Sequence, residues 1–108
     1  MATNLGEAIT LRTRIEAAEK AVHVTTLKKQ EATNAACFFA TKANAAEEAL
    51  QKADPKKPTY NDLAAAFHSA EADLAAAVEA ENLAWAEAAR AEARLSSAKS
   101  AAKAAYAI

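Results

Sequence analysis

The sequence predicts an all-α fold: a long antiparallel helical hairpin, packed as an alanine-rich two-helix coiled coil. Three observations lead to this prediction. Alanine, the strongest helix former, makes up about a third of the 108 residues. The only glycine is Gly6 and the only prolines are Pro55 and Pro58, so residues 7–53 and 60–106 form two arms of similar length without a helix breaker. In both arms apolar residues recur alternately every three and every four positions, the spacing of a left-handed coiled coil.

The first arm is expected to be helical over about residues 4–53. Asn4 can act as the N-cap, because Glu7 lies three residues further on, where its carboxylate can reach back to the N–H of the cap. The helix should end before Pro55, since a proline pushes the residue before it out of the helical region. β-branched residues are concentrated around Thr25. A break there, which would give a three-helix bundle, is the structural alternative.

The chain is expected to turn over residues 54–58 and to form its second helix over about residues 59–106. Thr59 can cap this helix, with Asp62 at the position that completes a capping box. A turn this short requires the two helices to be antiparallel neighbours. Residues 1–108 would then form a single helical-hairpin domain.

One stripe of mostly apolar residues, which we call the seam, runs along each arm. The seam positions are Leu11, Ile15, Ala18, Val22, Thr25, Lys29, Ala32, Ala36, Phe39, Ala43, Ala46, Leu50 and Ala53 in the first arm, and Leu63, Phe67, Ala70, Leu74, Ala77, Glu81, Ala84, Ala88, Ala91, Leu95, Ala98, Ala102 and Ala105 in the second. Folding about the turn pairs Leu50 with Leu63, and this register continues without a slip to Leu11 and Ala102. Most layers then set a large residue against a small one, which fills space without voids.

Two charged residues, Lys29 and Glu81, interrupt the seam. In the predicted register they lie about one helical turn apart across the interface. We predict that they form an ion pair that fixes the register, because the pair costs less than either charge alone.

Several large apolar residues lie outside the seam and would remain exposed on a single hairpin. They are Val24, Leu27, Phe38, Val78, Leu83 and Trp85, and they are the candidate interaction residues. A two-helix hairpin buries little surface relative to the entropy lost on ordering it, so we expect association into a helical bundle or array. Contact between like flanks would close a four-helix dimer, whereas contact between unlike flanks would give rings or open arrays.

The charge pattern argues against nucleic acid and membrane partners. The net charge is −1; residues 62–87 carry only acidic charges, and basic residues prevail from Arg90 onward. We interpret this pattern as complementing the helix dipole. No apolar run approaches the length of a membrane span, and no basic-then-apolar signal pattern begins the sequence. We therefore expect a protein partner, in first place the chain itself, in the cytoplasm or within an assembled particle.

The sequence shows no recognisable catalytic, cofactor or metal site, so we do not expect an enzyme. His68 and Glu71 have the spacing of half a di-iron motif, but the further inward carboxylates that such a site needs are missing. The single cysteine, Cys37, has no histidine at catalytic spacing and is expected to be a small buried apolar residue. There is no glycine-rich phosphate loop.

These absences favour a non-enzymatic structural or assembly protein, a self-associating hairpin within a larger particle such as a virion or scaffold. The alternative is a small protein-binding module, an inhibitor or adaptor acting through one face of the hairpin. The size and expected shape resemble the small secreted WXG-type proteins in architecture. Those proteins carry Trp-x-Gly in the turn, whereas Trp85 here lies within the second arm and is followed by Ala86 and Glu87.

Overall fold

Helix α1 spans Leu5–Gln51 without interruption. The structure is a computed structural model that describes residues 5–106. The predicted cap at Asn4 lies outside these residues. Near the start of α1, Arg12 Nε lies 3.3 Å from Glu16 Oε1, an exposed ion pair between successive turns of the helix. Such a pair supports the helix by only a few tenths of a kcal/mol.

The alternative of a break at Thr25 is wrong, because α1 continues through this position. The Thr25 hydroxyl donates to the carbonyl oxygens of Ala21, at 2.8 Å, and Val22, at 3.1 Å. The hydroxyl is thereby satisfied within its own helix and needs no partner across the seam. A half-buried threonine is therefore compatible with both the helix and the interface.

Helix α1 ends two residues earlier than predicted, at Gln51 rather than Ala53. Beyond it, the Lys52 N–H still donates to Glu48 O, but the Ala53 N–H donates to Leu50 O, both at 3.1 Å. The second of these bonds spans three residues, so the last turn tightens into 3₁₀ geometry. The coiled-coil spacing continues to Ala53, which is why the sequence pattern predicted a helix end two residues too late.

A single aspartate organises the connection between the helices. The Asp54 carbonyl accepts a hydrogen bond from the Lys57 N–H, and its side-chain Oδ1 accepts one from the Lys56 N–H, both at 3.0 Å. Pro55 stands second in this four-residue turn, where its fixed φ is favourable. No non-glycine residue in the described part has a positive φ, which excludes a type II turn.

Helix α2 spans Thr59–Tyr106, as predicted, and the Tyr60 N–H donates to Lys57 O where it begins. Asp62 in its first turn and Lys103 in its last turn complement the helix dipole. With two helices joined by a short turn and no strand among residues 5–106, the chain is an all-α helical hairpin, as predicted.

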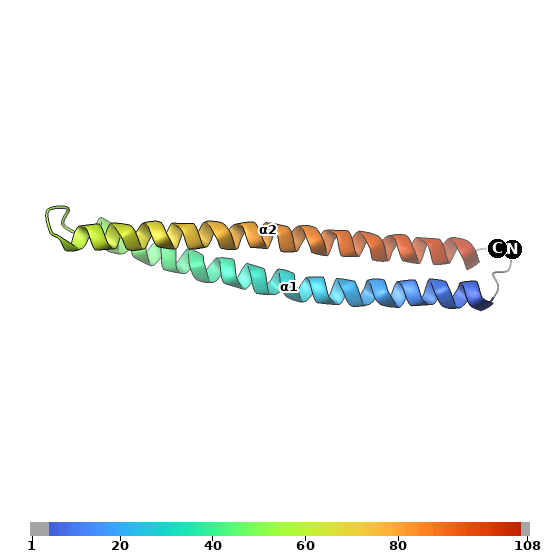
Figure 1. The fold of residues 1–108 in the computed structure, drawn as a ribbon. Helices are drawn as coiled ribbons and strands as arrows, with labels where there is room; N and C mark the ends of the chain where they lie inside the picture. The colour runs from blue at the N-terminus through green and yellow to red at the C-terminus, as the bar shows by residue number, and fades with distance from the viewer. Residues whose placement is uncertain (1–4, 107–108) are drawn as a thin grey trace. The chain divides into compact units, whose positions relative to one another are not determined.

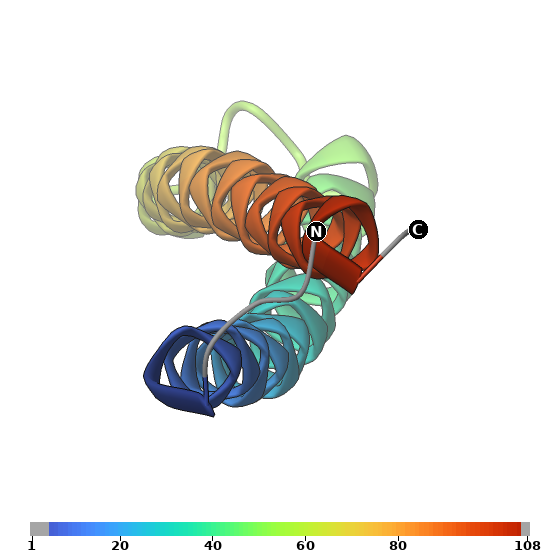
Figure 2. The same cartoon turned by 90° about the vertical axis from the view of Figure 1, so that its right-hand side faces the viewer.

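The hairpin divides into two compact units. Unit 1 comprises residues 1–29 and 84–108, and unit 2 comprises residues 30–83. In unit 1 the first part of α1, blue to cyan in Figures 1 and 2, lies beside the last part of α2, orange to red. In unit 2 the rest of α1 leads through the turn into the start of α2.

The predicted seam is confirmed, because all of its positions are buried or half-buried. The buried apolar side chains among the described residues are all alanines: Ala36 and Ala43 in unit 2, and Ala88, Ala91 and Ala102 in unit 1. Within the same residues no large side chain is fully buried, and even the leucines of the seam keep part of their surface in solvent. Each unit therefore has a core that buries little apolar side-chain surface.

Candidate interaction surface

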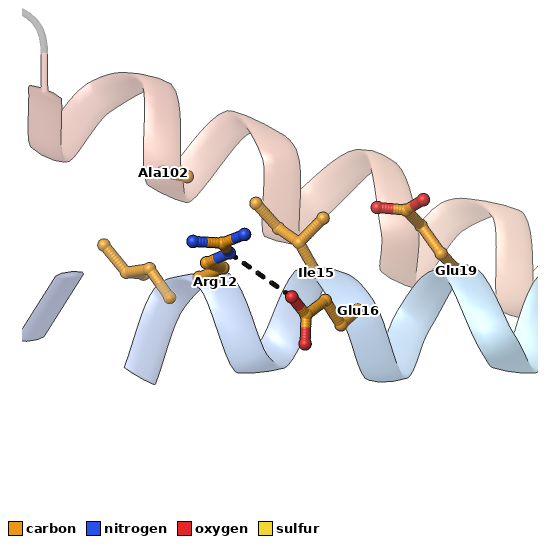
Figure 3. Close-up of a pocket in the computed structure, with 6 residues that line it drawn as sticks. Arg12, Ile15, Glu16, Glu19 and Ala102 are labelled. Carbon is orange, nitrogen blue, oxygen red and sulfur yellow. Dashed lines mark ion pairs between the residues drawn. The ribbon is translucent and has the colours of Figure 1, made fainter. Parts of the chain in front are cut away.

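The side chains of unit 1 pack in the antiparallel order that the sequence predicts. Leu11, Ile15 and Ala102 line one open groove of about 590 Å³, together with Arg12, Glu16 and Glu19. Figure 3 shows Ile15 pointing from α1 toward α2, with the ion pair of Arg12 and Glu16 beside it. The shared groove agrees with the predicted pairing of Leu11 and Ala102. Its charged lining residues are one arginine and two glutamates.

A second, shallower groove of about 340 Å³ lies further along unit 1. It is lined by two apolar residues, Val22 and Leu95, and by Glu19, His23, Thr26 and Lys99. His23 is exposed to solvent. Neither groove encloses enough apolar surface to bury a small ligand.

The seam lysine of unit 1 contacts an aromatic ring. Lys29 Nζ lies 3.7 Å from the centroid of the Trp85 ring, within cation–π distance. The predicted register sets position 29 opposite position 84, so a contact with Trp85 fits it. The predicted ion pair of Lys29 with Glu81 joins residues of different units and stays a prediction. Both residues are half-buried, as expected for seam positions.

Large apolar side chains are exposed on unit 1. Val24, Leu27 and Trp85 keep between 40 and 49 % of their surface in solvent, as the sequence analysis predicted. Ile9, which is 57 % exposed, belongs with them and was missed. Ile9 precedes the first seam residue, Leu11, by two positions, so the helical period alone places it off the seam.

Unit 2 carries a second set of exposed apolar side chains. Phe38, Val78 and Leu83 keep 54, 40 and 59 % of their surface in solvent, which confirms the exposure predicted for them. The ring of Phe38 packs edge-on against Phe39, with centroids 5.4 Å apart, and Lys42 Nζ lies 4.7 Å from the Phe38 ring centroid. Phe38 makes these contacts while about half of its surface stays in solvent.

The expectation for Cys37 was wrong: its side chain is exposed. Ala36, immediately before it, is the residue that fills the buried seam position. One step along a helix rotates the side chain by about 100°, which carries Cys37 out of the interface. Its small apolar character indicated burial, but its position in the repeat decided the outcome.

The chemistry that the described residues assemble is limited. His68 Nδ1 lies 3.5 Å from Glu71 Oε1 on the surface of α2. Among residues 5–106 no three histidine, cysteine or acidic side chains cluster in a way that could hold a metal ion. Over the same residues neither α1 nor α2 has an apolar stretch that could cross a bilayer.

Comparison with known proteins identifies no relative: no protein-family model, no curated protein and no solved structure matches the chain. The candidate interaction surface of each unit consists of its exposed large apolar side chains.

Proposed function

We propose that the chain is a non-enzymatic structural or assembly protein, a helical hairpin that associates with copies of itself within a larger particle such as a virion or scaffold. The observation that carries this proposal is the contrast in burial. The buried apolar side chains of the described part are alanines, whereas seven large apolar side chains are between 40 and 59 % exposed.

A lone hairpin of this composition has little free energy of folding, and this favours association. Burying one methylene group contributes about 0.8 kcal/mol, and an alanine side chain offers a single methyl group. Ordering each backbone residue costs about 1–2 kcal/mol, so a core of alanines and half-buried leucines leaves a lone hairpin marginal. Covering the exposed leucine, phenylalanine and tryptophan side chains would add the missing stabilisation. A copy of the same chain supplies such a cover in the cytoplasm or in a particle assembled there.

Analytical ultracentrifugation at tens of micromolar tests the proposal. We expect a species of at least twice the mass of one chain. Trp85→Ala should reduce the association, because large aromatic residues at interfaces contribute about 2 kcal/mol or more when buried by a partner. Ser96→Ala, an exposed substitution in the same part of α2, is the matched control and should leave the mass unchanged. A wild-type chain that stays monomeric throughout would exclude self-association.

A small binding module that inhibits or escorts a different protein is the second candidate. The half-exposed Trp85 ring, held beneath Lys29, favours it as well, because such a ring is a typical anchor of a protein interface. Under this alternative the wild-type chain would be monomeric and folded, and Trp85→Ala would remain folded while losing its partner.

A further inference from the structure

The two units carry opposite net charges, which the overall charge of −1 conceals. Unit 1 contains nine lysine and arginine residues against five acidic residues, a net charge of +4. Unit 2 contains four lysine residues against nine acidic residues, a net charge of −5. The division follows the packing of the chain: each unit combines parts of both helices.

These charges are available to a partner. In the described part of the chain every charged residue is exposed except Lys29 and Glu81, which are half-buried. Both units also present exposed large apolar side chains, Ile9, Val24, Leu27 and Trp85 on unit 1 and Phe38, Val78 and Leu83 on unit 2. Under the proposed self-association, apolar contact would drive association at either unit, and charge would decide which unit meets which.

We infer that the surface of unit 1 binds unit 2 of a second copy of the chain. Contact between two units 1 brings +4 against +4, and contact between two units 2 brings −5 against −5. Contact between unit 1 and unit 2 joins opposite charges. Electrostatic complementarity of this kind selects the partner and its orientation more than it sets the affinity. The inference rests on the proposed self-association and specifies its orientation.

Two double variants with the same net charge provide the sharpest test. Arg90→Gln with Arg94→Gln lowers unit 1 to +2, whereas Lys56→Gln with Lys57→Gln takes unit 2 to −7. All four residues are exposed, and each variant removes two positive charges from the chain. We expect the first variant to weaken self-association about threefold or more and the second to strengthen it, as measured by sedimentation equilibrium at about 50 mM salt. The opposite order of the two effects, or equal effects, would overturn the proposed orientation.

The salt dependence of self-association is an independent test of the proposed orientation. Screening weakens attraction between unlike units but relieves repulsion between like units. The dissociation constant of the wild-type chain should rise about tenfold between 50 and 500 mM sodium chloride. A constant that falls or stays unchanged would contradict the inference while leaving self-association intact. A monomer at both salt concentrations would instead refute the proposed function, and the inference with it.

Fluorescence resonance energy transfer between labelled copies measures the orientation directly. In a Cys37→Ser background, which removes the only cysteine, Asn44→Cys labels unit 2 and Ser96→Cys labels unit 1; all three positions are exposed. We expect efficient transfer when the donor is on the N44C variant and the acceptor on the S96C variant. Transfer should be weak when both dyes are on the N44C variant. Stronger transfer in the second mixture would show that like units meet.

Discussion

At the residue scale, the Trp85 ring both contacts Lys29 and exposes apolar surface to solvent. Its ring lies 3.7 Å below Lys29 Nζ, yet about half of its surface remains in solvent. Lys29 occupies a seam position and is half-buried, and its ammonium group reaches the ring. The negative face of the indole thus stabilises a cation at a position where an apolar residue would be usual.

A double-mutant cycle on this pair tests the contact. Lys29→Gln should lower the free energy of unfolding by about 0.5–1 kcal/mol in the wild-type chain, because the cation–π interaction is lost. In a Trp85→Leu background the same substitution should have little effect. Urea unfolding followed by circular dichroism, at a chain concentration low enough to avoid association, measures both values.

The exposed neighbour Lys28→Gln is the control for this cycle, and its effect should be the same in the two backgrounds. If Lys29→Gln also proved independent of Trp85, the contact would contribute nothing to stability.

At the scale of the element, α2 depends on small residues in the seam. Ala88 is 2 % exposed, the lowest value among the buried alanines, and Ala91 follows at 4 %. A methyl group lets helix axes approach closely, toward the short end of the range of about 8–10 Å. A larger side chain at such a position would push the axes apart, and a charged one would be kept from solvent.

Adjacent alanines of α2 allow a matched test of this interface. Ala88→Glu should lower the free energy of unfolding by about 2 kcal/mol or more, because it forces a carboxylate into a buried position. Ala89→Glu makes the same chemical change at an exposed position and should stay within about 0.5 kcal/mol of wild type. Helicity at 222 nm during thermal unfolding measures both. Equal costs at the two positions would show that the seam does not run through Ala88.

The helices and the seam could be predicted from the sequence because both follow from one strong period and two prolines. Thr59 and Tyr106 bound α2 as expected, and Phe38 and Trp85 are exposed as expected. Other features depend on atomic detail that a period does not contain. The 3₁₀ bond of Ala53 shortens α1, and the position of the Lys29 ammonium group over the Trp85 ring depends on the conformations of both side chains.

For the molecule as a whole, stability and association should be coupled. Each unit buries alanines and leaves large apolar side chains in solvent, so a partner that covers those side chains stabilises the folded chain. The unfolded chain has no such surface to offer. Folding equilibria of this protein should therefore depend on its concentration, unlike those of a monomer with a closed core.

Thermal unfolding at two concentrations tests this coupling. A fortyfold increase, from about 5 to 200 µM, favours an associating native state by about 2 kcal/mol, since the linkage term grows as RT ln of concentration. The melting temperature should rise by several degrees.

Trp85, the only tryptophan, reports the same event: its fluorescence emission should shift to shorter wavelength as a partner covers the ring. If melting temperature and emission maximum both stayed constant over this range, the exposed apolar side chains would not be joining copies of the chain. Trp85→Leu provides the matched comparison for melting, because a weaker interface should reduce the concentration dependence while leaving the alanine core in place.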